Sequence, residues 1–142
     1  MNKVSFNYAD RKLNLANKTK LKAFIPSIFK KEGKKLEAIN YVFCSDEYLL
    51  QINKDFLQHD YYTDIITFDL SESDATTSEV YISTDRIKDN SLQLETSFEQ
   101  EALRVIFHGA LHLCGYKDKS KKDIEIMRSM EEKYIKLYFK NK

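Results

Sequence analysis

The segment from residue 105 to residue 114 is apolar around nearly its whole circumference when it is wound as a helix. Its apolar residues point in every direction: Val105, Ile106, Phe107, Ala110, Leu111, Leu113 and Cys114. A surface helix has one apolar stripe, so a helix that is apolar all round must be covered by other elements. Ser97, with Gln100 three residues later, has the capping-box pattern that starts a helix. The chain therefore needs a fold with a central, covered helix.

Two histidines, His108 and His112, interrupt this apolar helix four residues apart. That spacing places both imidazoles on one face with their β-carbons about 5–6 Å apart, which suits a shared metal ion. Burying an unpartnered polar group costs roughly 1–3 kcal/mol, and a shared metal ion would offset that cost. The alternative is that each imidazole is a core residue with its own hydrogen-bond partner. We interpret the pair as metal ligands.

Gly115 follows the histidines at a position where a helix can end in a left-handed turn. Such a turn lets the chain double back and present Asp118 as a third ligand. Three protein ligands with one open position are typical of catalytic rather than structural zinc. We therefore predict that His108, His112 and Asp118 bind one Zn²⁺ ion. Cys114 lies on a different face of the helix and is not a predicted ligand.

The remaining sequence alternates between strand-like and helix-like segments. We expect strands at residues 4–8, 36–44, 64–70 and 80–83, and further helices at 17–31, from 45, at 84–90 and from 120. Pro26 should kink or restart its helix, and the polar residues 71–78 should form a mobile loop. In the helix after Ser45, we expect Leu49, Ile52 and Phe56 to face inward. These patterns predict an α+β (mixed α/β) single domain over residues 1–142, in which about five helices pack on a small mixed four-stranded sheet, with the metal site on a central helix.

Composition and charge narrow the functional classes. The sequence has 42% hydrophobic residues, no apolar run of membrane-spanning length and two distant cysteines, which favours a cytoplasmic protein with reduced thiols. Residues 1–40 carry ten Lys/Arg against three Asp/Glu, and residues 117–142 carry nine against five. Residues 41–116 carry four against fourteen. Basic surfaces are how proteins meet phosphate backbones, although such charges also simply solvate helix faces.

Two segments resemble the YbeY family of ribosomal-RNA maturation endoribonucleases. The run from His108 to Asp118 is similar to the family's histidine motif, and the run from Ile52 to Phe68 is similar to its other signature, with matches at Asn53, Asp60, Thr63, Asp64 and Phe68. The resemblance implies a zinc-dependent enzyme that cuts single-stranded RNA, matures the 3′ end of 16S rRNA and acts in ribosome quality control. It implies rRNA and the small ribosomal subunit as partners, with no membrane and no nucleotide cofactor.

The sequence departs from the family pattern at several positions. Asp118 stands where the third ligand is usually a histidine, and Lys117 stands where an aspartate is common. Leu57 occupies the place of an arginine that the family uses for activity, and Tyr62 replaces a proline. Aspartate still binds zinc through oxygen. Leucine cannot contact phosphate, so another basic residue would have to replace that arginine.

Two alternatives stay open. A metzincin-like metalloprotease shares the spacing from His108 through Gly115 to Asp118, but Gly109 stands where the protease motif has its catalytic glutamate. A non-catalytic ribosome-assembly factor with a structural metal would also fit. No general base stands out, and Asp64 and Asn53 are weak catalytic candidates. His59, the third histidine, is interpreted as loop surface.

Overall fold

The computed structural model of the protein describes residues 3–58 and 63–140. Its centre is a four-stranded sheet in the order β1 (Val4–Tyr8), β2 (Lys35–Cys44), β4 (Ala75–Ser83) and β3 (Ile65–Asp69). β1, β2 and β4 are parallel, and β3 pairs antiparallel with β4. The predicted mixed four-stranded sheet is confirmed.

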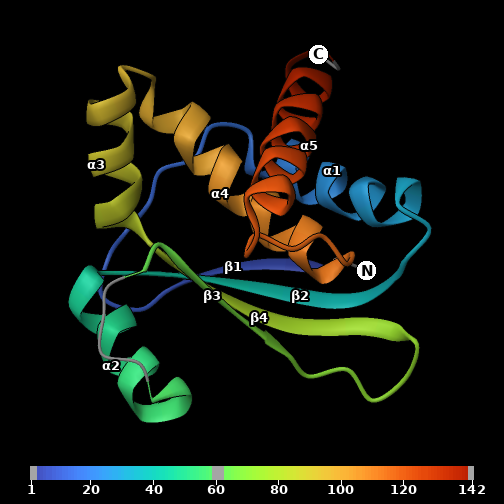
Figure 1. Ribbon diagram of the computed structural model, residues 1–142, viewed down its shortest axis with the longest axis horizontal. Coiled ribbons are helices and arrows are strands. Elements are labelled where there is room, and N and C mark those ends of the chain that lie inside the picture. Colours follow the sequence, from blue (N-terminus) through green and yellow to red (C-terminus); the bar gives the residue numbers. More distant parts are fainter. Residues whose placement is uncertain (1–2, 59–62, 141–142) are drawn as a thin grey trace.

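Five helices are present in the described part of the chain, and they cover the two faces of the sheet unequally. Four lie on one face: α1 (Lys18–Lys31), α3 (Thr84–Leu94), α4 (Phe98–Leu113) and α5 (Lys121–Lys140). The fifth, α2 (Asp46–Leu57), lies on the opposite face (Figure 1). Among these helices, none is long and apolar enough to span a lipid bilayer. The four-stranded sheet and the five helices of the described residues confirm the predicted α+β class and the approximate number of helices.

Helix α4 is the covered helix that the sequence requires. It packs against α1, α3 and α5 and against strands β3 and β4. Its buried apolar residues lie on several sides of the helix: Ala102, Leu103, Val105, Ile106, Phe107, Ala110 and Leu111. The hydroxyl of Tyr41 on β2 donates to the carbonyl oxygen of Ile106, which ties the helix to the sheet. The element that carries both histidines is thus fixed by the core.

Local signals set most helix boundaries as expected. The side chains of Ser45 and Ser97 accept the backbone N–H groups of Tyr48 and Gln100, which satisfies donors that a helix start leaves open. Ser120 and Asp123 do the same reciprocally at the start of α5. Helix α1 runs through Pro26 as one element instead of restarting. Its buried stripe continues on both sides of the proline, so packing holds the two halves together.

Two expectations about polar and apolar segments were wrong. Residues 75–78 are the first part of β4 and not a loop, because they pair with β2 and their hydroxyls find partners: Thr77 donates to Glu37 and Ser78 to the carbonyl oxygen of Phe68. Phe56 is 70% exposed, and its ring contacts that of Phe68 on β3 edge-on. The apolar cluster under α2 is small and does not reach the last turn of that helix.

Candidate functional site

Helix α4 ends in the glycine turn that the sequence predicts. Gly115 has φ +112°, a conformation that only glycine adopts without strain. Its N–H donates to the carbonyl oxygen of His112 (3.0 Å), and the N–H of Tyr116 donates to that of Leu111 (3.1 Å). These two bonds form a Schellman motif, which satisfies the carbonyl groups at the helix end. The chain reverses direction at this point.

The returning segment brings Asp118 back to the helix. Its Oδ2 atom lies 3.2 Å from Nε2 of His108. The hydroxyl of Tyr116 donates to Glu32 at the end of α1 (2.7 Å), and Tyr134 of α5 donates to the other oxygen of the same carboxylate. The turn that carries Asp118 is therefore fastened to two helices as well as to α4.

The second nitrogen of His108 is held by a carboxylate from α5. Nδ1 lies 2.7 Å from Oε2 of Glu131, which is 5% exposed. Metal-binding histidines usually donate their other ring N–H to a carboxylate or carbonyl, which fixes the tautomer and the ring orientation. Burial alone would lower the pKa of His108, but the hydrogen bond to Glu131 and the charges of Glu131, Asp64 and Asp118 outweigh it and raise that pKa. His108 is therefore oriented with Nε2 toward Asp118.

Glu131 belongs to a wider network of charges behind His108. Arg104, one turn before His108 on α4, lies 3.5 Å from Glu131 and 3.3 Å from Glu101, and it also pairs with Glu132. Burial opposes the charge of Arg104, but the three carboxylates outweigh burial and raise its pKa. The guanidinium and the carboxylates thus compensate one another's charge in a buried place.

The three predicted ligands meet around one small hollow. His108, His112 and Asp118 line a cavity of about 160 Å³ together with Ile65 and Thr67 of β3. Within residues 3–58 and 63–140, no three His, Cys, Asp or Glu side chains stand close enough to hold a metal ion as they are placed. The chemistry of the donors nevertheless fits zinc, because two imidazoles and one carboxylate are common zinc ligands. The His112 side chain is exposed.

The weak catalytic candidates lie on either side of this hollow. Asp64 is half-buried and lines a cleft of about 420 Å³ that also contains His108 and Asp118. Burial raises the pKa of Asp64, and the nearby charge of His108 partly opposes the shift. Asn53 is buried and lines a neighbouring hollow of about 340 Å³, together with His112 and Asp118. Both candidates are thus close to the predicted ligands.

Several residues of the second signature lie outside the described part of the chain. These are His59, Asp60 and Tyr62. Leu57 is described, is 40% exposed and lines the same hollow as Asn53. The two cysteines are buried and unpaired, and burial raises the pKa of each thiol to about 12. This agrees with their interpretation as reduced core residues.

The close packing of α4 on the sheet explains why residue 109 is a glycine. A β-carbon at this position would lie 3.0 Å from Cδ1 of Ile65 and 3.1 Å from Cγ1 of Val80. The helix therefore approaches the sheet so closely that any side chain at residue 109 requires the ends of the Ile65 and Val80 side chains to shift. The protease arrangement, which needs a glutamate next to the first histidine, is sterically disfavoured here.

Sequence reasoning missed Glu131 and Arg104. A signal for each was present. Glu131 lies four residues after Met127 and three before Tyr134, on the core-facing stripe of α5, where a carboxylate needs a partner. Arg104 lies four residues before His108, on the same face of α4. A charged residue on a buried helix face is therefore a candidate to support a metal-binding histidine that lies on or against that face.

Comparison with known proteins gives a consistent result. The family described as Endoribonuclease YbeY matches residues 5–138. Endoribonuclease YbeY of Cytophaga hutchinsonii is 45% identical over 135 residues, covering 94% of both chains. The Flavobacterium psychrophilum protein of the same name is 42% identical over 135 residues, covering 95% of this chain and 96% of its own.

A solved structure agrees with these relatives. The solution structure of a Thermotoga maritima protein superimposes with a TM-score of 0.65 and 26% identity. The superposition covers 96% of this chain and 89% of the Thermotoga chain. The family match, the sequence identity and the fold agree over almost the whole length, and the chain therefore belongs to the endoribonuclease YbeY family.

Proposed function

We propose that this chain is a zinc-dependent endoribonuclease that cuts single-stranded RNA. An endoribonuclease role in rRNA processing follows from its family. The finer proposal is that it matures the 3′ end of 16S rRNA on the small ribosomal subunit in the cytoplasm and takes part in ribosome quality control. The domain over residues 1–142 would act as one metallo-hydrolase unit.

The observation that carries the proposal is the double engagement of His108. One ring nitrogen is bound to the buried carboxylate of Glu131, and the other faces Asp118 at 3.2 Å. Both ring nitrogens of His108 therefore face carboxylates, one from α5 and one from the turn after α4. The carboxylate behind the ring and the carboxylate in front of it are the arrangement expected of a metal ligand.

His108, His112 and Asp118 would hold the metal. A bound zinc ion would act as a Lewis acid that stabilises charge on the phosphodiester as it breaks. Glu131 keeps the His108 ring oriented, and the anchored turn keeps Asp118 in place. Asp64 is the proposed proton acceptor, because it lies in the same cleft and burial raises its pKa toward neutrality. Asn53 would position the substrate from the neighbouring hollow.

The test combines metal analysis of the purified protein with a cleavage assay on single-stranded RNA. The wild type should contain about one zinc per chain and cut the RNA. His112→Ala should lose both the zinc and the cleavage activity. Because the His112 side chain is exposed, its removal should leave the fold intact. Glu125→Ala, which removes an exposed carboxylate of α5, is the matched control and should keep both.

Other outcomes point to the rival functions. RNA bound but not cut by zinc-loaded protein would support a non-catalytic assembly factor with a structural metal. Chelator-sensitive cleavage of an unstructured protein such as casein would support the protease. Either result would overturn the endoribonuclease proposal for this chain.

A further inference from the structure

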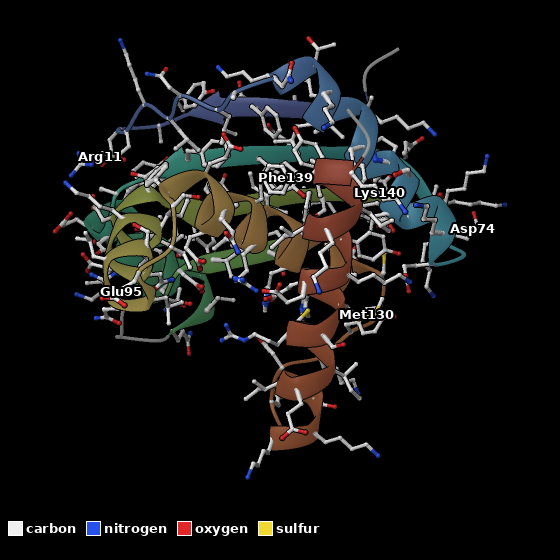
Figure 2. All side chains as sticks on the ribbon, turned by 90° about the horizontal axis from the view of Figure 1, so that it is seen from above. Arg11, Asp74, Glu95, Met130, Phe139 and Lys140 are labelled. Carbon is white, nitrogen blue, oxygen red and sulfur yellow. The ribbon has the colours of Figure 1, made fainter. Side chains whose placement is uncertain are left out.

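The cleft beside His108 extends well beyond the predicted metal ligands. Helix α3 forms one wall, α5 forms the other, and α4 forms the floor. Figure 1 shows α4 between these two helices, and Figure 2 shows Glu95, directly after α3, and Met130 of α5 on opposite sides of it. The volume of the cleft, about 420 Å³, lies in the range of small-molecule sites, roughly 300–1,000 Å³. The cleft is large enough for one nucleotide.

Each wall contributes an exposed aliphatic side chain to this cleft. Leu94 at the end of α3 is 53% exposed, and Ile124 in the first turn of α5 is 47% exposed. Both side chains leave apolar surface in water at the mouth of a polar site. A flat ring inserted between them would cover that surface.

The wall formed by α3 also offers two side-chain amides. Asn90 and Gln93 line the cleft three residues apart, so their amides share one face of the helix. Neither side chain has a hydrogen-bond partner among the described residues. Each amide provides both donors and an acceptor, which is the pattern needed to read the edge of a nucleobase.

Charge separates the depth of the cleft from its mouth. The depth contains Asp64, Glu101 and Glu131, and the cation there, Arg104, is engaged by carboxylates. An anionic phosphate is therefore disfavoured in the depth, whereas a neutral ring with N–H donors is accepted. Arg128, at the mouth, is exposed and forms no ion pair with any described residue. The guanidinium of Arg128 is therefore the group in this cleft that would bind a phosphate.

We propose that this cleft binds the nucleotide next to the scissile phosphate. Its base lies between Leu94 and Ile124 with its edge on Asn90 and Gln93, and its phosphate contacts Arg128. The position next to the scissile bond rests on the function proposed above, because His108 and Asp118 line the same cleft. In this arrangement Arg128 supplies a cation from α5 at the cleft, whereas Leu57 lines the neighbouring hollow with Asn53.

The first test measures binding directly and does not depend on cleavage. The full-length protein, with and without added zinc, is titrated with the four nucleoside monophosphates while the side-chain amide NMR signals of Asn90 and Gln93 are followed. Ribose 5-phosphate, which has the phosphate but no base, is the control ligand. Shifts caused by the nucleotides alone support the proposal. Equal shifts with ribose 5-phosphate, or no shift with any nucleotide, overturn it.

The second test uses matched pairs of exposed residues on the same helices. Leu94→Ser/Ile124→Ser alters the cleft, whereas Leu92→Ser/Ile126→Ser alters neighbours that are similarly exposed but do not line it. The first pair should weaken nucleotide binding and raise the KM for RNA about tenfold at nearly constant kcat, and the control pair should change neither. Equal effects of the two pairs would overturn the proposal.

An abasic substrate completes this test. RNA that lacks the base next to the cut site should be cleaved with the same KM by the wild type and by Leu94→Ser/Ile124→Ser, because the contact is already missing. A difference that persists on the abasic RNA counts against the base pocket. If the wild type cuts no RNA and still shows the nucleotide-specific NMR shifts, the endoribonuclease proposal fails while the nucleotide site stands.

Discussion

The two signature segments of this chain are supported very differently. The first, from His108 to Asp118, is packed against the sheet at Gly109, hydrogen-bonded to α5 through His108 and fastened to α1 through Tyr116. The second, from Ile52 to Phe68, begins on a helix that covers the opposite face of the sheet almost alone (Figure 1), and its Phe56 and Leu57 are exposed.

This difference explains where the chain departs from the family pattern. A change at Gly109 or His108 must satisfy packed neighbours, whereas Asp118, at the end of this segment, is exposed and offers a carboxylate in place of an imidazole. In the second segment Leu57 is 40% exposed at the end of α2, so a leucine can stand there in place of a cation at little cost to the fold. Packing therefore restricts Gly109 and His108 more than it restricts Phe56 and Leu57.

The largest effect should come from filling the contact at Gly109. Gly109→Glu places a charged side chain against Ile65 and Val80, whose side-chain ends a β-carbon alone would approach to 3.0 and 3.1 Å. We expect the free energy of unfolding to fall by more than about 4 kcal/mol, measured by urea denaturation. Gly109→Ala should lose only about 1–2 kcal/mol, because overpacking by one methyl group is partly offset by the better helix propensity of alanine. A stable Gly109→Glu protein would show that the sheet and α4 are not tightly coupled.

A smaller effect should follow from weakening the support of His108. Glu131→Gln keeps the shape of the side chain but removes the charge that orients the ring. We expect the zinc affinity to fall roughly 10- to 100-fold, measured by competition with a chromophoric chelator. Glu132→Gln is the control, since Glu132 also pairs with Arg104 but does not contact His108. Equal losses in both variants would assign the effect to the charge network as a whole.

The same contrast decides what was predictable from the sequence. The strands at 4–8 and 36–44, the capped helices and the glycine turn depend on local patterns, and the structure confirms them. The placement of Phe56 and the pairing of residues 75–78 depend on how far each face of the sheet is covered, which no local pattern encodes. Glu131 meets His108, and Arg104 meets Glu131, only through the packing of α4 on α5. The ligand candidates were thus accessible to sequence reasoning, whereas the sequence marks Glu131 only as a carboxylate on a buried stripe and does not identify His108 as its partner.

The smallest effect tests the exposed segment. Leu57→Arg restores a cation beside the hollow that contains His112 and Asp118, whereas Phe56→Arg places the same charge one residue away on a side chain that does not line it. We expect Leu57→Arg to strengthen RNA binding a few-fold and to steepen its salt dependence by about one phosphate contact, as measured by fluorescence anisotropy at several salt concentrations. Phe56→Arg should change binding much less, and both variants should keep the stability of the wild type. Equal gains from the two variants would mean that RNA senses only the general charge of this surface, and the exposed segment would then have no defined place in the site. A gain confined to Leu57→Arg would show that an exposed segment keeps a precise function even where its packing is loose.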